Sequence, residues 1–420
     1  MYIFGHNVTS KCCKCVRCYC STLNSHEFNV PLICRMLHGT FTSGILPTQY
    51  EKLCQAADIG TIKEDDRNVV LGEYQEVVQD LAESSMETAL QEEITASVLE
   101  EAADNYQGLK VLSDARHCWR KNAYYSDVVF LGHTTHRAIH HELVSKEDDP
   151  ISQNHETIGT ERFYEWADAR GLSIHLHGHD RNGSVNKIVK DRQFTGNAND
   201  TWHATKNLAR SFVKVTKGKP INRGITWHPE LSDKAAGIKT HFYWSMKTCN
   251  GDPVLLRSRL DNIVRHYQND HRNCFAGNVR LPGARCKTDP NYEPTRTTIR
   301  DPVAAQLLTR WIQKTTIYEW PMDYVDCVDT HYVESFNNSL LQYHDKRIVF
   351  GNSQYTMRSH LSILDWNEHV DRDYTSIIRR QSAKNPRRVE GHKVLKPKTN
   401  SFKRTIWDRF MARIFPAGED

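Results

Sequence analysis

The sequence predicts an α/β protein in which a mixed β-sheet is flanked by helices. Two observations lead to this fold class. Short apolar runs of strand length contain β-branched residues and lie at 109–112, 127–131, 138–144 and 172–176. Between and after them, apolar residues recur at helical spacing in the segments 156–170, 184–192 and 202–216. This order of strands and helices favours a sheet with helices packed on its faces.

The region before the first strand is expected to be helical. Apolar residues from 36 to 108 recur at helical spacing, as Tyr74, Val77 and Leu81 do. The stretch from Glu64 to Asp104 holds thirteen acidic residues and one basic residue. We therefore expect an N-terminal helical region with one apolar face and one acidic face.

Two of the predicted helices after the strands have clear features. The helix at 156–170 is followed by Gly171, and glycine is common just past the C-terminus of a helix. The helix at 202–216 carries Lys206 and Arg210 one turn apart, which gives it a basic face. Both segments are therefore predicted as helices.

The composition changes twice in the second half of the chain. Residues 248–300 are rich in Gly, Pro, Asn and Cys, which is typical of an inserted module. A last helix is predicted at 332–342. From Arg379 to Arg404 the chain carries ten basic residues and one acidic residue. This tail is expected to be solvated, and it can also contact phosphates or serve as a nuclear import signal.

Composition excludes several classes of protein. A hydrophobic content of 39% is too high for a disordered chain, and the net charge is only +4. No apolar run approaches the roughly 18 residues of a membrane helix, and the first ten residues lack the basic start of a signal peptide. We expect an intracellular protein with no membrane partner. Its twelve cysteines are then thiols or metal ligands rather than disulfides.

Acidic residues follow two of the predicted strands, Asp114 after the first and Asp180 after the fourth. Carboxylates at the C-terminal ends of strands lie at the edge of a sheet, where a divalent cation can bind. Together with Glu334 on the last predicted helix, they can hold two Mg²⁺ ions about 3.5–4 Å apart, a geometry suited to phosphoryl transfer. A strand-end aspartate is also a common turn or cap residue, so spacing alone leaves both interpretations open.

Several longer strings carry a family resemblance. They are HDRNGSVNK (179–187), NDTWHATK (199–206), THFYWSM (240–246), LDNIVRHY (260–267), NYEPTR (291–296), YVESFNNSLLQYHDKRIVFG (332–351) and LDWNEHVDRDYTS (364–376). In this order and density, the strings resemble a transposon-derived family of animal DDE transposase-like proteins, related to the Kolobok and Mutator-like superfamilies. The resemblance covers roughly residues 109 to 376.

The resemblance implies an RNase H-like fold with Asp114, Asp180 and Glu334 as a catalytic triad that binds Mg²⁺ or Mn²⁺. It also implies DNA as the partner and assembly into dimers or larger oligomers. Asp200 and His203 match an Asp-x-x-His pattern that supports the site in such enzymes. Asp200 also suits a helix cap, and it is the rival of Asp180 for the second triad position.

The resemblance further implies an inserted domain, because the interval from Asp180 to Glu334 is too long for a minimal core. The predicted domains are a cysteine-rich segment and zinc-binding remnant (1–35), a helical region (36–108), the first part of an RNase H-like core (109–247), an insertion (248–320), the last core helix with the third carboxylate (321–376) and a basic tail (377–420).

Zinc is expected inside the predicted insertion. His271 and Cys274, with Cys286 and either His266 or Cys249, can make a tetrahedral zinc site. The spacing matches no standard zinc finger, so buried thiols with surface histidines remain the alternative. The sequence therefore contains five candidate ligands for a site that needs four.

The N-terminal cysteines give a second, independent expectation of zinc. Cys15 and Cys18 have the Cys-x-x-Cys spacing of half a zinc knuckle, and His26 and Cys34 can supply the other half. No standard finger spacing fits this segment. It is consistent with the remnant of a truncated DNA-binding finger.

Basic residues near the predicted carboxylates are expected to neutralise phosphates brought to the metal ions. These residues are Arg116, Lys187, Lys206, Lys346 and Arg347. Trp202 can stack on a base, although packing in the core is the commoner role of tryptophan.

The functional expectation is a transposase that cleaves a DNA strand at the element end and joins the 3′-hydroxyl to target DNA in the nucleus. Retention of all three acids favours this activity. The alternatives are a domesticated, catalytically inactive DNA-binding or chromatin protein, and an RNase H-like nuclease without strand transfer. The missing standard finger favours a decayed or truncated copy.

Overall fold

The computed structural model describes residues 29–58, 60–101, 106–118, 122–275, 285–345, 348–381 and 389–415. Within this part, the chain forms two compact units. The first comprises the described residues of Met1–Leu109, Asp114–Gly171 and Tyr332–Asp420, and the second comprises Lys110–Ser113 and Leu172–His331. No helix of the described ranges is both long enough and apolar enough to cross a membrane.

A five-stranded mixed sheet with helices against it confirms the predicted α/β class. Its strands are β1 (Leu109–His117), β2 (Tyr125–Gly132), β3 (Ala138–Ser145), β4 (Ile174–His179) and β5 (Gly196–Asn199), in the order β3-β2-β1-β4-β5. The β2–β3 pair is antiparallel and the β4–β5 pair is parallel. Helix α5 (His155–Ala169) packs on β2 and β3, and α6 (Gly183–Asp191) packs on β5.

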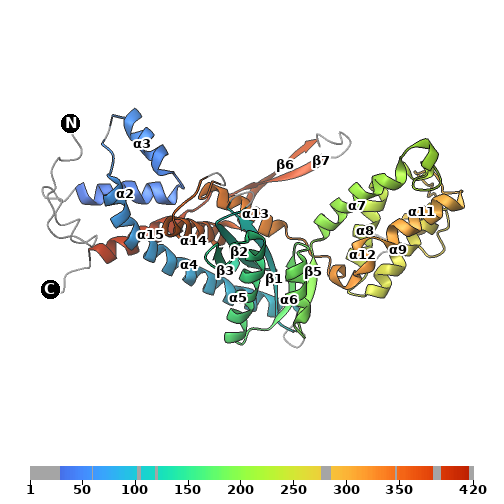
Figure 1. Cartoon of the computed structure of the whole chain (residues 1–420), viewed down its shortest axis with the longest axis horizontal. Helices are drawn as coiled ribbons and strands as arrows, with labels where there is room; N and C mark the ends of the chain where they lie inside the picture. Colours follow the sequence, from blue (N-terminus) through green and yellow to red (C-terminus); the bar gives the residue numbers. More distant parts are fainter. Residues whose placement is uncertain are drawn as a thin grey trace. The chain divides into compact units, whose positions relative to one another are not determined.

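The core of the first unit lies between helices that are far apart in the sequence. The long helix α4 (Glu64–Glu101) runs beside α14 (Asn352–His369) and α15 (Ser401–Ile414) (Figure 1). Apolar side chains of α4 at helical spacing, among them Tyr74 and Val78, are fully buried there. Helices α2 (Asn29–Thr42) and α3 (Pro47–Ala56) contribute to the same core, and α13 (His331–Ser339) with η6 (Leu340–Gln342) precede α14.

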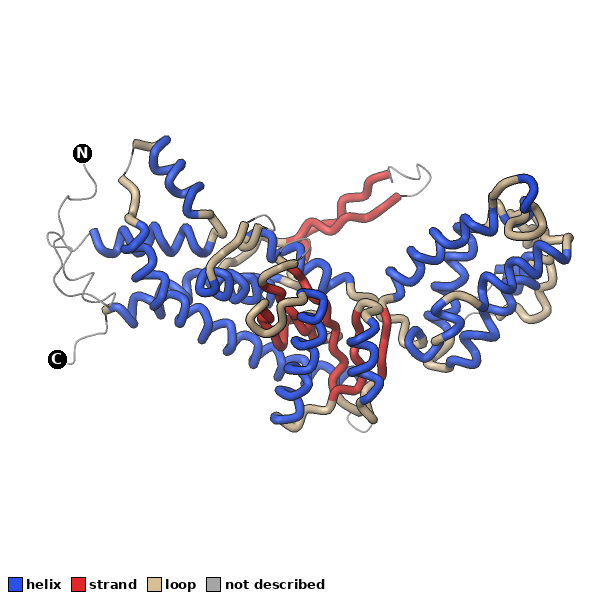
Figure 2. Tube along the Cα trace, viewed as in Figure 1, coloured by secondary structure: helices blue, strands red, loops and turns tan. Residues whose placement is uncertain are grey.

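The predicted basic tail is folded over much of its length, which differs from the expectation of a solvated segment. Strands β6 (Tyr374–Gln381) and β7 (Val389–Leu395) form an exposed antiparallel hairpin, drawn as a two-stranded ribbon in Figure 2. Helix α15 then buries Phe402, Ile406 and Phe410 in the core of the first unit. The sequence pattern does not reveal this helix readily. Its apolar residues lie on one face only, and basic residues stand between them in the sequence.

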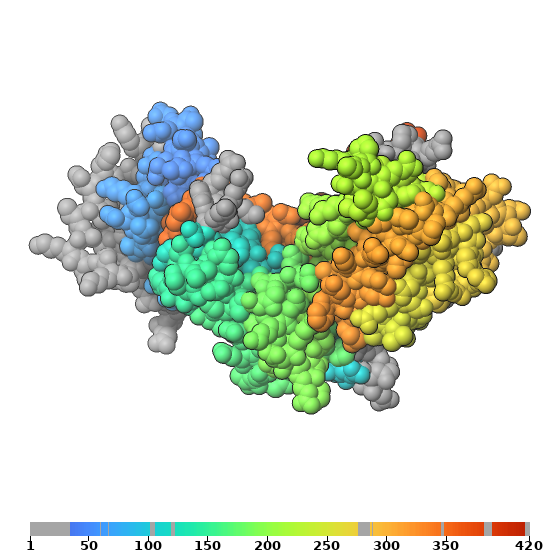
Figure 3. Space-filling view, turned by 45° about the vertical axis from the view of Figure 1, so that its right-hand side comes forward, coloured from blue at the N-terminus to red at the C-terminus, as the bar shows by residue number. Residues whose placement is uncertain are grey.

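The second unit is mostly helical. Its main helices are α7 (Thr201–Thr216), α8 (Ala235–Thr248), α9 (Pro253–Tyr267), α11 (Pro302–Gln313) and α12 (Thr316–Glu319), with the short α10 (Arg285–Thr288) and the 3₁₀ turns η3 (Pro220–Asn222), η4 (Pro229–Leu231) and η5 (Pro321–Tyr324). Residues from Ala204 to Val325 share one apolar core. Figure 3 shows the segments around 240–270 and 300–325 meeting in one continuous surface. The domain boundary that the sequence predicts between residues 247 and 248 therefore falls inside this apolar core.

Gly44 occupies a position in the first unit that only glycine fits. It follows α2 with a φ of +73°, in the left-handed region that other residues adopt at a cost. A Cβ at this position would collide with the carbonyl oxygen of Gln342. Buried Arg358 adds a constraint, because its guanidinium donates to the carbonyls of Gly44, at 3.2 Å, and Ile45, at 3.1 Å.

Gly44→Ala is therefore expected to lower the free energy of unfolding by about 3 kcal/mol or more. Gly39→Ala is the matched control, because Gly39 lies in α2 and a Cβ there would have nothing within 4 Å. This control should stabilise the unit by up to about 1 kcal/mol through helix propensity. Urea unfolding followed by circular dichroism measures both, and equal midpoints for the two variants would contradict the steric argument.

Candidate metal centres

An acidic cluster forms where β4 and β5 end. These parallel strands pair in a register that places His179 opposite Asn199, and the residue that follows each strand is an aspartate, Asp180 after β4 and Asp200 after β5. Parallel strands bring their carboxyl ends to the same edge of a sheet. The pairing of β4 with β5 therefore places the two carboxylates side by side.

The start of α7 brings a histidine to the same place. Asp200 is the N-cap of α7, and its Oδ1 accepts a hydrogen bond from the backbone N–H of His203 at 2.5 Å. One turn into the helix, Nδ1 of His203 donates to Oδ1 of Asp180 at 2.8 Å. One ligand atom from each of Asp180, Asp200 and His203 lies within 4.8 Å of the others, which suits a metal ion.

The two aspartates differ in how much of their carboxylate is already engaged. The Asp200 side chain is 3% exposed, and its Oδ2 accepts hydrogen bonds from the backbone N–H and the hydroxyl of buried Thr330, at 2.7 and 2.6 Å. The Asp180 side chain is 41% exposed. Asp200 therefore anchors the chain around Thr330, whereas Asp180 faces solution. No pattern in the sequence points to Thr330, which lies 130 residues away.

A buried histidine supports the Asp180 backbone. His179 hydrogen-bonds through Nε2 to the side chain of Asn197 at 2.9 Å and through Nδ1 to the carbonyl of Asp180. Burial lowers the pKa of His179, while the bonds to Asn197 and Asp180 act in the opposite direction. The end of β4 is thus held by side-chain bonds as well as by the strand ladder.

The other two predicted triad members belong to the first unit. Asp114 lies on β1, and its Oδ2 accepts a hydrogen bond from the side-chain amide of Asn337 at 2.8 Å. Glu334 lies on α13 one turn before Asn337, so both residues are on the same face of that helix. Sequence reasoning does not single out Asn337, although it lies within the YVESFNN string.

The residues predicted to contact phosphates lie in different environments in the structure. Arg116 is buried, pairs with Asp127 at 3.7 Å and donates to the carbonyl of His344 at 3.0 Å, so its position does not suit a phosphate contact. Lys187 on α6 is exposed. Lys346 and Arg347 lie outside the described residues.

Trp202 is exposed next to the acidic cluster, which differs from the core packing that is common for tryptophan. It is 41% exposed, and its ring centroid lies 4.9 Å from that of His203. The ammonium of Lys206, one turn further along α7, lies 4.3 Å from the centre of the Trp202 ring. An exposed aromatic ring with a lysine on its face can stack on a base while the lysine meets a phosphate.

A second cluster, of two histidines and two cysteines, lies in the helical part of the second unit. It comprises His266 near the end of α9, His271 and Cys274 in the following turn, and Cys286 on α10. One ligand atom from each lies within 4.8 Å of all the others. Sγ of Cys274 lies 3.5 Å from Nδ1 of His266 and 3.6 Å from Nδ1 of His271, and Sγ of Cys286 lies 3.8 Å from Nδ1 of His266.

The other predicted cysteine ligands lie elsewhere. Cys249 is fully buried, and its thiol bonds the carbonyls of Met246 and Val325. Cys34 is buried in the helical core of the first unit. Cys15, Cys18 and His26 lie outside the described residues.

Burial favours the uncharged forms of two members of the His/Cys cluster. It lowers the pKa of His266 to about 4, with a further contribution from neighbouring His271. It raises the pKa of the Cys286 thiol to about 12, with a further contribution from Cys274. A neutral imidazole is the form that ligates a metal, whereas the thiol would have to lose its proton.

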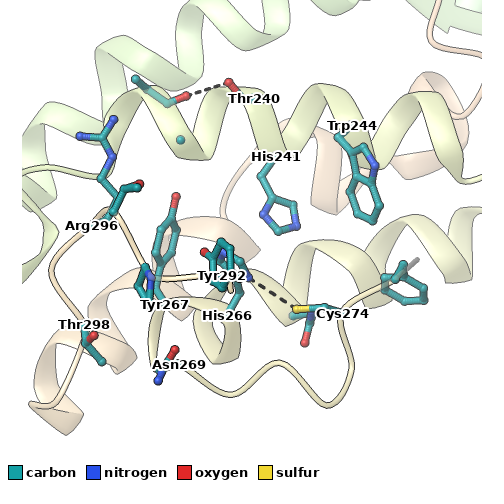
Figure 4. A pocket seen from close by; sticks show the side chains of 16 residues that line it. Thr240, His241, Trp244, His266, Tyr267, Asn269, Cys274, Tyr292, Arg296 and Thr298 are labelled. Carbon is teal, nitrogen blue, oxygen red and sulfur yellow. Dashed lines mark hydrogen bonds between the residues drawn. The ribbon is translucent and has the colours of Figure 1, made fainter. Parts of the chain in front are cut away.

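A cavity of about 540 Å³ adjoins this cluster. His266 and Cys274 form part of its wall, and the helical residues Thr240, His241 and Trp244 face them (Figure 4). Further wall residues come from the segment after α9 and include Tyr292, Arg296 and Thr298. The segment between α9 and α11 thus supplies three of the four cluster residues and one side of the cavity.

Comparison with known proteins adds no assignment to either cluster. No protein-family model matches this sequence, and a search of curated proteins finds no match either. The candidate sites therefore rest on their geometry and on the sequence strings that carry the family resemblance.

Proposed function

We propose that this chain is a transposon-derived DDE-type transposase that cleaves DNA and transfers the cut strand. The observation that carries the proposal is the convergence of Asp180, Asp200 and His203 at the carboxyl ends of β4 and β5. The same three residues belong to the strings HDRNGSVNK and NDTWHATK, which carry the family resemblance. Carboxylate oxygens are the donors that Mg²⁺ prefers.

The three side chains have distinct roles in this proposal. Asp180 is the metal-binding member, because its carboxylate is accessible to solution. Asp200 is a positioning residue, since it caps α7 and holds Thr330. His203 orients Asp180 through the 2.8 Å bond and can hold a proton beside the scissile phosphate. Two bound Mg²⁺ ions would activate a water or 3′-hydroxyl and stabilise the leaving oxygen.

The order of strands and helices supports the proposal. A mixed five-stranded sheet, with an antiparallel hairpin on one side and a parallel pair on the other, is compatible with an RNase H-like core. The helices from α7 to α12 lie in the sequence between the second and third predicted acids, as an inserted domain would. Asp114 and Glu334, which belong to the first unit, are the other two acids that the family resemblance assigns to the triad.

DNA is the proposed partner, and the nucleus is the proposed location. The exposed Trp202 ring with the Lys206 ammonium over its face offers a stacking and phosphate contact on the helix that also carries His203. Exposed Lys187 adds positive charge on α6.

The test is a cleavage assay on DNA that carries the ends of the corresponding element, with a plasmid as target. Purified full-length protein is expected to nick the element ends in Mg²⁺, to leave 3′-hydroxyls and to join them to the plasmid. EDTA should abolish both steps. Binding without cleavage would instead identify a domesticated DNA-binding protein, and cleavage without joining would identify a nuclease. Either result would overturn the proposal.

A further inference from the structure

We propose that His266, His271, Cys274 and Cys286 form a structural Zn²⁺ site that fastens the segment between α9 and α11 to the helical body. All four side chains belong to the second unit, and their ligand atoms converge within 4.8 Å. This proposal is independent of catalysis, because none of the four residues belongs to the acidic cluster.

The separations between the ligand atoms match tetrahedral zinc. Zn–S bonds are about 2.3 Å and Zn–N bonds about 2.0–2.1 Å, so at the tetrahedral angle a sulfur and a nitrogen on one zinc lie about 3.5–3.6 Å apart. The observed S···N separations are 3.5 and 3.6 Å from Cys274 and 3.8 Å from Cys286. Both histidines point the same ring atom, Nδ1, at these sulfurs, as ligands of one ion would.

The ligand types favour zinc over the other divalent cations of the cell. Two imidazole nitrogens and two sulfurs suit Zn²⁺, whereas Mg²⁺ and Ca²⁺ require oxygen donors. Binding would form two Zn–N and two Zn–S bonds and release the two thiol protons to solvent. The resulting centre is electrically neutral, and four protein ligands leave no open position, which is typical of a structural site.

The segment around the site has little regular structure of its own. Between the end of α9 at Tyr267 and the start of α11 at Pro302, the described residues form one helix, the four-residue α10. Long segments with so little regular structure are uncommon inside compact domains unless something ties them down. The backbone N–H of Ile299 donates to the carbonyl of Tyr267 at 2.8 Å, which brings the two ends of the segment together. The proposed ion would tie Cys286, in the middle of the segment, to the three ligands near its start.

The first experiment measures zinc in the purified full-length protein by plasma mass spectrometry. Because the N-terminal cysteines can bind zinc themselves, the informative quantity is the difference between variants. Cys274→Ser combined with Cys286→Ser should lose one equivalent relative to wild type. Cys118→Ser combined with Cys327→Ser is the matched control, since it also removes two thiols, neither in the cluster, and it should keep the full zinc content. Equal zinc in the two double variants would overturn the proposal.

A ligand swap keeps the test informative if the double variant folds poorly. His271→Cys preserves a zinc ligand and should retain the metal, whereas His271→Ala should weaken zinc binding at least tenfold in a chelator competition. Replacement of zinc by Co²⁺ should give the intense visible bands of tetrahedral cobalt with thiolate charge transfer in wild type. Their persistence at full strength in the Cys274/Cys286 variant would contradict the assignment.

Hydrogen exchange tests the structural consequence. When zinc is removed by a chelator, exchange should rise in the described peptides 268–275 and 285–299, and exchange in α4 should stay unchanged. Loss of zinc without any change in the exchange of these two peptides would show that the ion does not hold this segment. That result would contradict the structural role.

Discussion

Replacing Asp180 by asparagine is expected to lower the rate of Mg²⁺-dependent strand cleavage about a thousandfold. The amide keeps an oxygen that can accept from His203, but it removes the negative charge that binds a divalent cation. Loss of about 4 kcal/mol of transition-state stabilisation corresponds to this factor, because each 1.36 kcal/mol changes a rate tenfold. Single-turnover cleavage of element-end DNA measures it.

Asp191→Asn is the matched control, because Asp191 is an exposed acid at the end of α6. It should cleave at the wild-type rate. If the Asp180 variant also retained that rate with normal circular dichroism, Asp180 would be removed from the triad.

The remaining acids can be separated by the same assay. Asp114→Asn and Glu334→Gln should match the loss seen for Asp180 if all three bind the catalytic ions. Asp200→Asn should mainly lower thermal stability, because it weakens the hold on Thr330. Abolished cleavage in the Asp200 variant combined with retained cleavage in the Asp180 variant would give Asp200 the second triad position.

Mild acid is expected to destabilise the first unit strongly. Burial lowers the pKa of His344 and His360 to about 3 and that of His38 to about 4, from 6.5 in the unfolded chain. Between pH 6.5 and pH 4, the unfolded chain therefore takes up protons at these positions that the folded unit does not, so acid favours unfolding. At 1.36 kcal/mol per pH unit per group, the three histidines together cost about 6 kcal/mol at pH 5.

Denaturant unfolding between pH 7.5 and pH 5 measures this effect. His360→Gln should reduce the slope of stability against pH by one proton, or about 1.4 kcal/mol per pH unit. A flat profile in the wild type would contradict the prediction. Asp127 contributes little change in this window. Burial acts to raise its pKa, but His141, His344 and Arg116 hold the pKa below the usual range, so the stability that its carboxylate contributes is lost only as the pH falls from about the ordinary carboxyl pKa of 3.8 towards the lowered folded value.

The strands are predictable where their own side chains are apolar. The runs at 109–112, 127–131, 138–144 and 172–176 all fall within or overlap β1 to β4, because buried strands need β-branched and aromatic residues. Strand β5, with the sequence GNAN, is absent from the prediction. It exists because it pairs with β4 and because Asn197 bonds to His179, and neither interaction is visible in a local pattern.

Helix α14 is absent from the prediction for a different reason. It is buried on nearly all sides and carries polar residues inside, such as Arg358, Asp365 and Asn367. These groups bond to partners outside the helix: Asn367 bonds the backbone of Ala138, and Arg358 donates to the carbonyl of Tyr343. A helix with polar residues on its buried faces shows no apolar periodicity, so the hydrophobic pattern cannot reveal it.

The sequence identifies candidate site residues, but it does not show which of them lie together in the fold. The predicted insertion contains five candidate zinc ligands, and the structure brings four of them together while Cys249 lies among apolar residues. Asp180 and Asp200 are rivals in the sequence, and the burial of each carboxylate distinguishes them. The position of a residue in the sequence does not show whether its side chain is buried. The choice between His266 and Cys249, and that between Asp180 and Asp200, therefore requires the fold.

The way the first unit is assembled also affects how it is made in the cell. The apolar face of α4 is covered by α14 and α15, which begin about 250 and 300 residues after α4 ends. At translation rates of about 5–20 residues per second, a ribosome needs roughly 10 to 60 seconds to produce them. During that interval Tyr74 and its neighbours have no native partners from either helix, so the nascent chain is a natural client for chaperones.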